Sequence, residues 1–131
     1  MSQVAEVTVA KSGEIRVDRV VVVLDTGVVV NPDIVTAQMQ SGIIFGISGV
    51  LWGEITFENG RVQQSNFDNY RVLRMEEAPV IEVEIVKSYE APGGIGEPGT
   101  SALAPAVLNA VHAATGVRLR KTPIGSSLPV L

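Results

Sequence analysis

A short glycine-rich run isolates one carboxylate, Glu97, among residues with few functional side chains. The run from Gly93 to Gly99 reads GGIGEPG. Gly96 has access to backbone angles that are closed to other residues, and Pro98 favours an extended conformation at the residue before it. The pattern therefore predicts that Glu97 projects from a turn, where an ionised carboxylate suits a general base.

The segment that follows this run is typical of a helix. Pro98 suits a first helical turn, and an apolar periodic stretch runs from Leu103 to Val111. The helix dipole would favour the ionised form of Glu97. The same position is also typical of a carboxylate that only caps a helix. The spacing alone leaves both interpretations of Glu97 open.

Residues Gly94 to Gly99 also match the dinucleotide-binding fingerprint GxGxxG. A Rossmann unit requires a second strand after the helix, with an acidic residue about twenty residues beyond the glycines. Here that region reads VRLRK from Val117 to Lys121, and the chain ends soon after. A small nucleotide-binding domain is therefore an alternative with less support.

Composition limits the classes of function. The 131 residues are 46% hydrophobic, which is enough for one compact core and predicts a single domain, 1–131. A net charge of −4 and 5% aromatic residues argue against nucleic-acid partners. The chain has no cysteine, so it cannot ligate an iron–sulfur cluster, and its one histidine argues against a zinc site.

The sequence shows no expected targeting or membrane segment. The first residues have neither a basic flank nor an apolar core typical of a signal peptide. The apolar segment from Ile34 to Trp52 is interrupted by Gln38, Gln40 and several glycines, so we expect no membrane span. We expect a cytoplasmic location; a periplasmic one stays open, because an upstream signal would lie outside this chain.

The periodicity predicts an α+β fold with mainly antiparallel strands and two principal helices. Asn31 and Pro32 are typical of a helix start, and Asn59-Gly60 of a hairpin turn. Glycines on the first helix would let another backbone approach. The predicted elements are strands at 3–10, 14–24 and 80–86, a helix at 32–52, a hairpin at 54–64, a helix at 100–115 that stops at Gly116, and a short basic strand after it.

Several other residues are read as structural. Trp52, Phe45 and Phe57 are predicted to lie in the core. His112 is predicted to pack in the last helix without a chemical role. Gln38 lies in the first helix, where its position alone is most typical of a solvent-facing residue.

The sequence as a whole resembles the C-terminal end of the large subunit of molybdenum hydroxylases, the xanthine dehydrogenase and aldehyde oxidase superfamily. Within it, the chain is most similar to the large, beta, subunit of isoquinoline 1-oxidoreductase-type enzymes. The matching runs keep the family's order over nearly the whole chain. They are LDTG from Leu24, VNPD from Val30, AQM from Ala37, GIIFG from Gly42, QSNF from Gln64, APGGIGEPG from Ala91, APAV from Ala104 and NAV from Asn109.

The resemblance implies hydroxylation of an aldehyde or an N-heteroaromatic carbon, with water supplying the oxygen. Glu97 would be the catalytic base, and Gln38 would face the pterin end of the cofactor. Gly96 would belong to the cofactor site because a side chain there would crowd the metal. The implied cofactors are molybdenum-molybdopterin, as the cytosine dinucleotide, and a [2Fe-2S] cluster on a partner chain.

The chain is several times shorter than a complete molybdenum-binding subunit. We therefore expect it to be a part of that subunit, whose partners would be the remainder of the subunit, an iron–sulfur subunit and a small aromatic or aldehyde substrate. Alone, it is expected to bind no cofactor, to be inactive and to self-associate. The alternative to a catalytic segment is a noncatalytic module that docks on the rest of the complex.

Overall fold

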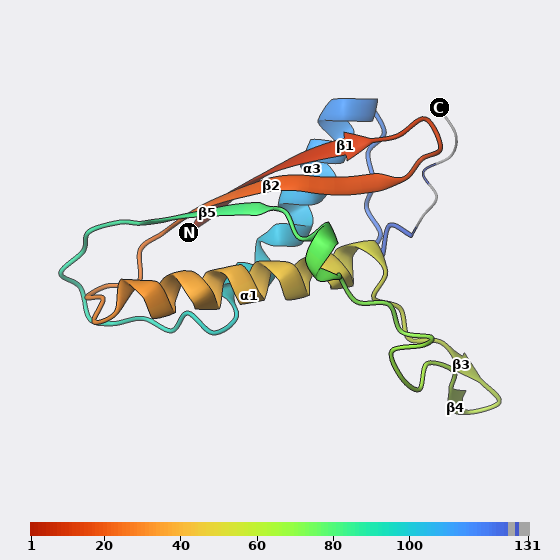
Figure 1. Ribbon diagram of the computed structural model, residues 1–131, viewed down its shortest axis with the longest axis horizontal. Coiled ribbons are helices and arrows are strands. Elements are labelled where there is room, and N and C mark those ends of the chain that lie inside the picture. Colours follow the sequence, from red (N-terminus) through yellow and green to blue (C-terminus); the bar gives the residue numbers. More distant parts are fainter. Residues whose placement is uncertain (126–127, 129–131) are drawn as a thin grey trace.

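The chain forms a three-stranded sheet with its helices on one face (Figure 1). The computed structural model describes residues 1–125 and residue 128. The sheet has the order β1-β2-β5, with β1 at Ser2–Val9, β2 at Ile15–Leu24 and β5 at Val80–Ile85. β1 and β2 form an antiparallel hairpin, whereas β5 pairs with β2 in parallel. The α+β prediction is confirmed, with a parallel pair that the strand pattern alone did not indicate.

β2 is the central strand, and one of its faces forms the floor of the core. Val20 and Val22 have no exposed surface, while Val23 on the other face is 38% exposed. The register between β1 and β2 shifts between Glu6 and Val7. Such a bulge places an extra residue in one strand and keeps apolar side chains on the covered face on both sides of it.

The helix α1, Pro32–Leu51, connects β2 to β5 and packs across the sheet. Asn31 caps it, because its Oδ1 atom accepts hydrogen bonds from the backbone N–H groups of Asp33 and Ile34 at 3.1 and 3.2 Å. A parallel strand pair requires a long crossover connection, which α1 provides. The predicted helix is therefore confirmed within one residue at its end.

By length and composition alone, α1 could cross a membrane, since an 18-residue window has a mean hydropathy of 1.5. This corrects the expectation that the segment is too interrupted to qualify. Half of the window is buried inside the protein. A core helix therefore accounts for the apolar sequence.

The last helical segment is divided into α2, Pro98–Ser101, and α3, Leu103–Thr115, with a break at Ala102. The sequence predicted one continuous helix here. α3 ends at Gly116, as predicted, in a left-handed conformation with φ of 75°. The expected strand after α3 was wrong: Val117 and Leu119 are half-buried against the core, and their alternation reflects this packing of an extended segment without strand pairing.

The segment between α1 and β5 lies largely outside the body of the protein. Its hairpin consists of β3, Phe57–Glu58, and β4, Arg61–Val62, and projects away from the sheet and helices (Figure 1). Asn59 and Gly60 both have positive φ, as the hairpin turn requires. A 3₁₀ helix η1, Met75–Glu77, precedes β5. Phe57 is 71% exposed, so its predicted place in the core was wrong.

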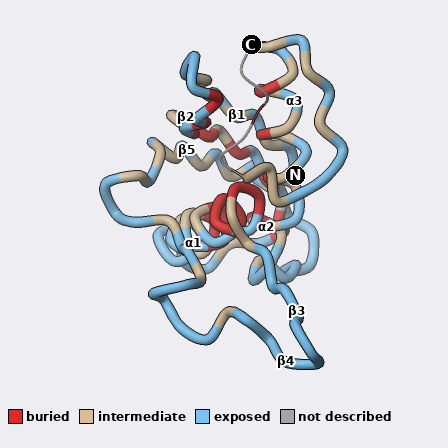
Figure 2. Tube along the Cα trace, turned by 90° about the vertical axis from the view of Figure 1, so that its right-hand side faces the viewer, coloured by how far each residue is buried: buried red, intermediate tan, exposed pale blue. Residues whose placement is uncertain are grey.

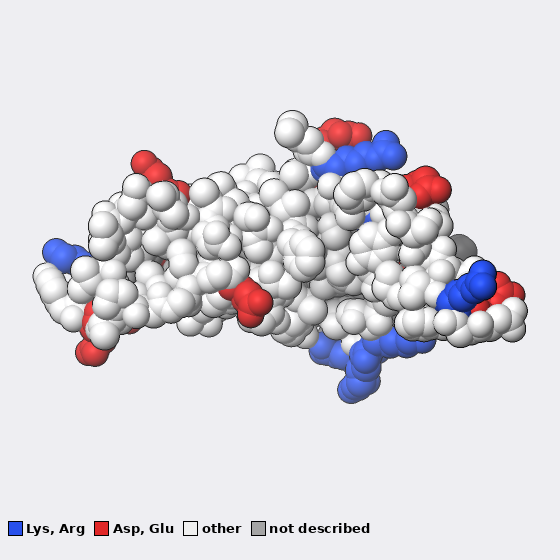
Figure 3. All heavy atoms as spheres, turned by 90° about the horizontal axis from the view of Figure 1, so that it is seen from below, with Lys and Arg blue, Asp and Glu red and all other residues white. Residues whose placement is uncertain are grey.

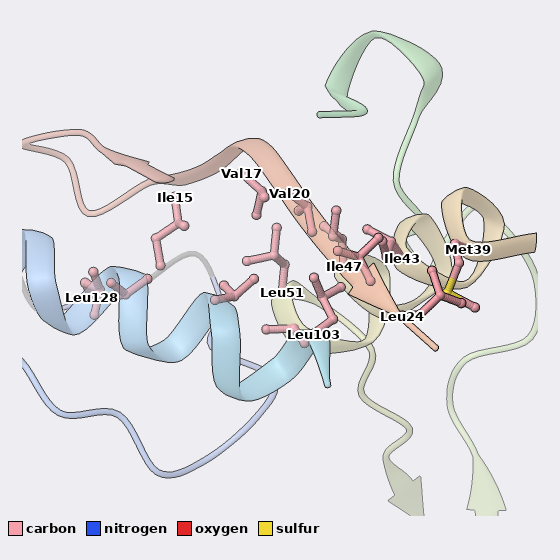
Figure 4. Packing of buried hydrophobic residues seen from close by; sticks show 14 of the residues in the cluster. Ile15, Val17, Val20, Leu24, Met39, Ile43, Ile47, Leu51, Leu103 and Leu128 are labelled. Carbon is pink, nitrogen blue, oxygen red and sulfur yellow. The ribbon is translucent and has the colours of Figure 1, made fainter. Parts of the chain in front are cut away.

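The core lies between the sheet and the helices, where the buried residues cluster (Figure 2). Figure 4 shows side chains from β2, α1 and α3 directed toward one another. The fully buried side chains, those with less than 2% exposure, are Met39, Ile43 and Ile47 of α1, Leu103, Val107 and Val111 of α3, Val20 and Val22 of β2, and Leu128. This core fixes α1, which is the element that supports the candidate site.

Candidate functional site

The loop that carries Glu97 begins after β5 and passes beneath the N-terminal half of α1 (Figure 1). A turn after β2 holds its first part. The backbone N–H of Gly93 donates to the carbonyl of Thr26 at 2.8 Å, and the Thr26 hydroxyl donates to the carbonyl of Gly93 at 3.1 Å. Thr26 is buried. The two hydrogen bonds therefore fix the loop at Gly93.

The far end of the loop is fixed where α2 meets α1. Gln3 donates from Nε2 to the carbonyl of Gly99 at 3.0 Å, and the Thr100 hydroxyl donates to the carbonyl of Gly42 at 3.0 Å. A Cβ atom on Gly99 would lie 3.1 Å from the carbonyl oxygen of Met39. The predicted close approach of a backbone to the glycines of α1 is confirmed at Gly42, whereas Gly49 meets nothing within 4 Å.

Gln38, Gly96 and Glu97, the three site residues predicted from the sequence, lie together. Gln38 donates a hydrogen bond from Nε2 to the carbonyl oxygen of Gly96 at 3.1 Å. All three residues line one open hollow beside α1. The other residues lining it are Ser41, Gly42, Phe45, Thr100 and Ser101.

Glu97 is exposed and occupies the N-cap position of α2 without a capping hydrogen bond from its side chain. Its carbonyl oxygen accepts hydrogen bonds from the backbone N–H groups of Thr100 and Ser101 at 2.9 and 3.4 Å. α2 has only four residues, so its dipole is small. The backbone of Glu97 thus begins the helical turn, while its carboxylate is not used in capping and the residue lines the hollow.

Gly96 does not have a positive φ, so it does not use the left-handed backbone angles that are open to glycine. A Cβ atom at Gly96 would also meet nothing within 4 Å in the described residues. Neither conformation nor packing within this chain accounts for a glycine at this position. The open space beside Gly96 is where a bound group would approach the loop backbone.

The loop backbone offers hydrogen-bond donors to such a group. In the described part of the chain, no acceptor is recorded for the backbone N–H groups of Gly94, Ile95, Gly96 and Glu97. Gly96 and Glu97 also line the hollow with Gln38, and their N–H groups and the Gln38 amide suit a polar organic group with several acceptor atoms. Among residues 1–125 and 128, no cluster of three metal-ligating side chains occurs.

The structure does not contain the elements that the dinucleotide alternative requires. The helix directly after the glycine loop is the single turn α2. Residues 117–121, which would form the next strand, do not pair with any strand in the described part of the chain. The fingerprint match therefore does not correspond to a Rossmann unit in the described residues.

Two residues of the site have roles that the sequence reading missed. Phe45 was predicted to lie in the core, but it is 73% exposed and lines the hollow. Gln38, Ser41 and Phe45 follow one another at helical spacing, which is the sequence signal that places all three on one face of α1. Thr26 carried no chemical signal, since only the fold shows that it holds the glycine loop.

A second hollow lies at the other end of α1, roughly 20 Å from Gln38 along the helix axis. Ile47, Leu51 and Trp52 contribute to its wall, and the Arg71 guanidinium lies 3.8 Å from the centre of the Trp52 ring. The backbone N–H of Arg74 lowers the pKa of Glu77, and Arg71 lowers it further. This charge cluster orders the segment before β5 and is separate from Glu97.

Comparison with known proteins gives a consistent result. The sequence profile of the family described as molybdopterin cofactor-binding domain matches residues 1–79. The chain is 40% identical over 114 residues to isoquinoline 1-oxidoreductase subunit beta of Brevundimonas diminuta, covering 87% of this chain and 15% of that protein. It is 38% identical over 122 residues to membrane-bound aldehyde dehydrogenase [pyrroloquinoline-quinone] of Gluconacetobacter polyoxogenes, covering 92% and 16%.

The fold is also found in a solved structure, quinoline 2-oxidoreductase of Pseudomonas putida 86. The TM-score is 0.80 at 24% sequence identity, with 88% of this chain and 16% of that chain covered. The chain thus spans about a sixth of the length of the relatives it matches. Glu97 lies outside the part matched by the family profile but inside these longer similarities by their coverage.

Proposed function

The chain belongs to the molybdopterin cofactor-binding domain family, and on that premise we propose that it is the segment of a molybdenum hydroxylase that supplies the general base, Glu97. The whole enzyme would hydroxylate an aldehyde or an N-heteroaromatic carbon with oxygen from water. The proposed partners are the remainder of the molybdopterin-binding subunit and a chain that carries a [2Fe-2S] cluster, since this chain has no cysteine.

The observation that carries the proposal is the arrangement of Gln38, Gly96 and Glu97 around one hollow. The Glu97 side chain makes no capping hydrogen bond. Beside it, a Cβ atom on Gly96 would meet nothing within 4 Å, and backbone N–H groups of the loop have no acceptor within the described residues. These residues fit the pterin end of molybdenum-molybdopterin, which we propose is the cytosine dinucleotide form. The backbone N–H groups of residues 96 and 97 and the Gln38 amide would hold it.

The bound cofactor would supply the redox chemistry, and this chain would supply position and proton transfer. Glu97 would accept a proton from the water that becomes the new hydroxyl group. A carboxylate at an open loop is accessible to that water, and its place on the backbone of a fixed turn limits how far it moves. The turn at Thr26 and the contact between α1 and α2 provide this support.

The test is Glu97→Gln in the assembled enzyme. The amide keeps the shape of the side chain but cannot accept the proton at neutral pH, so kcat should fall by about a hundred- to ten-thousandfold. Molybdenum content and melting temperature should stay close to those of the unsubstituted enzyme. All three quantities are to be measured on the same preparation.

Glu90→Gln is the matched control, because Glu90 is an exposed carboxylate earlier in the same loop and does not line the hollow that contains Glu97. It should leave kcat unchanged. Normal kcat in Glu97→Gln with intact cofactor would remove Glu97 from the mechanism. A loss of stability of roughly 1 kcal/mol with near-normal turnover would instead support the helix-cap interpretation.

A second candidate, a noncatalytic docking module, is favoured by the outer face of α1. Besides its buried side, the helix has an exposed uncharged stripe at helical spacing, and a helix that is apolar all round is normally covered on all sides. Figure 3 shows a broad area of uncharged atoms interrupted by isolated charged side chains. The exposed residues of the stripe are Ile34, Ala37, Ser41, Phe45 and Gly49.

This docking role is compatible with catalysis, and the two are distinguished by Glu97→Gln. A base is required for turnover, whereas a docking module would tolerate the substitution as long as the assembly forms. Subunit association should therefore be measured with kcat. Normal association with a large loss of kcat supports the catalytic proposal over docking alone.

A further inference from the structure

One contact in the site concerns how Glu97 is held in place. Within the described residues, the loop backbone from Gly94 to Glu97 receives one side-chain hydrogen bond, from Gln38 Nε2 to the carbonyl oxygen of Gly96 at 3.1 Å. The flanking anchors are at Gly93 and Gly99 themselves. The Gln38 bond lies between these two anchors, at the peptide directly before Glu97.

The peptide unit that Gln38 contacts also contains the backbone nitrogen of Glu97. Peptide units are planar, so fixing the carbonyl of Gly96 fixes the plane from which the Cα atom of Glu97 departs. Gly96 has no side chain, and the space around it is open. Packing therefore does not hold this peptide, and a free glycine would allow several orientations.

Gln38 is itself on a rigid support. It lies in α1 beside Met39, which is fully buried, and one turn from Val35, which is 8% exposed. Its donor atom is thus set by the core, while the carbonyl it binds belongs to a glycine loop. The hydrogen bond therefore fixes the loop at Gly96 relative to the core helix α1.

We propose that Gln38 is a positioning residue that aims Glu97 by holding the Gly96–Glu97 peptide. This inference rests on the proposed role of Glu97 as the base. It does not compete with a contact to the cofactor, because a glutamine amide has a second N–H and an acceptor oxygen that this bond leaves available. It does predict that Gln38 influences turnover through the loop.

The test uses the assembled enzyme with Gln38→Leu, which keeps a helix-compatible side chain of similar length but removes the donor. Gln40→Leu is the matched control, since Gln40 lies on the same helix and does not line the hollow. The first measurement is hydrogen exchange of the backbone N–H groups of Thr100 and Ser101, which donate to the carbonyl of Glu97. Exchange should become about two- to tenfold faster in Gln38→Leu, as expected for the loss of one hydrogen bond, and stay unchanged in Gln40→Leu.

The second measurement is kinetic. Gln38→Leu should lower kcat by about ten- to a hundredfold at unchanged molybdenum content, with KM within about twofold, because a misplaced base affects the chemical step more than substrate binding. Gln38→His, which restores an N–H donor of similar reach, should recover much of kcat and of the exchange protection. Rescue of both quantities together is the signature of positioning.

Two outcomes would overturn the inference. Unchanged exchange in Gln38→Leu would show that the bond does not hold the loop, and if activity then falls in proportion to molybdenum content, Gln38 acts only as a cofactor contact. Faster exchange with normal kcat, while Glu97→Gln is inactive, would show that the base is positioned without Gln38. Failure of the base role itself is recognised separately, as normal kcat in Glu97→Gln.

Discussion

At the scale of single residues, the site depends on one carboxylate and on the absence of side chains around it. Glu97 has backbone contacts that start α2 but no capping bond from its carboxylate. Gly96 has neither a positive φ nor a close neighbour. Gly27 and Gly99, in contrast, have backbone atoms close to where a Cβ atom would lie. The open glycine beside Glu97 fits the proposal that a bound group approaches the loop there.

Gly96→Ala tests whether the glycine at this position is needed by the fold of this chain or by a group bound from outside it. The new methyl group meets nothing within 4 Å in this chain, so melting should be unchanged or the chain stabilised by up to about 1 kcal/mol. In the assembled enzyme, the same methyl group should reduce molybdenum content or kcat at least tenfold, because it would occupy cofactor space.

The comparison for this substitution is Gly94→Ala. Gly94 has equally open surroundings and borders a shallower hollow with Gly96 and Glu97, but it lies outside the hollow that Gln38 lines. Its effect on molybdenum content should be the smaller of the two. Equal, full retention of metal and kcat in Gly96→Ala would show that no bound group approaches this glycine.

At the scale of elements, the site is the meeting of a rigid helix with a loop that two anchors hold. The turn after β2 is the first anchor, and its Gly27 has a φ of 73°. A Cβ atom there would lie 2.2 Å from the carbonyl oxygen of Ala91. The turn and the loop are therefore in direct backbone contact, and the position of one determines the position of the other.

Gly27→Ala should accordingly destabilise the chain by at least about 2 kcal/mol, since it combines backbone strain with a collision against backbone atoms. Gly60→Ala is the matched control. Gly60 has a similar φ of 76° but meets nothing within 4 Å, so it reports the backbone strain alone. Thermal unfolding of both variants measures the difference, and equal losses would show that the turn does not pack on the loop.

At the scale of the whole molecule, the chain has a continuous buried core, but parts of its surface are apolar or hollowed and are left uncovered. The sheet and helices bury a continuous apolar cluster. The outer stripe of α1, the hollow beside Glu97 and the projecting hairpin are all left open. The chain spans about a sixth of the length of its relatives, which agrees with surfaces that the rest of a larger subunit would cover.

The isolated chain should therefore hold no molybdenum and should not oxidise aldehydes or N-heterocycles, because one helix and one loop do not enclose a pterin dinucleotide. Metal analysis after purification and turnover assays with both substrate classes are the measurements. Stoichiometric molybdenum in the purified chain would contradict this expectation.

The same open surface predicts self-association of the isolated chain. Phe45→Gln should weaken it and reduce binding of a hydrophobic dye, because Phe45 is the large apolar residue in the exposed stripe that also borders the Glu97 hollow. Met75→Gln is the control, since Met75 is 93% exposed on η1, away from α1's outer stripe. Sedimentation of the three chains gives the result; a monomeric unsubstituted chain that binds no dye would count against the prediction.

Local sequence determined most of the elements of this protein. Apolar alternation, the cap at Asn31, the turn at Asn59-Gly60 and the stop at Gly116 each act over a few residues, so β1, β2, α1, β5 and the end of α3 follow from short-range pattern. The glycine run and the resemblance to the molybdenum hydroxylases together singled out Glu97, Gln38 and Gly96.

Only the tertiary structure decided how these parts meet. The parallel pairing of β5 with β2, the break at Ala102 and the exposure of Phe45 depend on contacts between residues far apart in the chain, for which local periodicity carries no signal. Alternation at 117–121 predicted a strand, but the same alternation arises wherever an extended segment packs on a core. The hydrogen bond from Gln38 to Gly96 spans α1 and the loop, and it exists because the core fixes one partner while Thr26 and Gln3 hold the loop that carries the other.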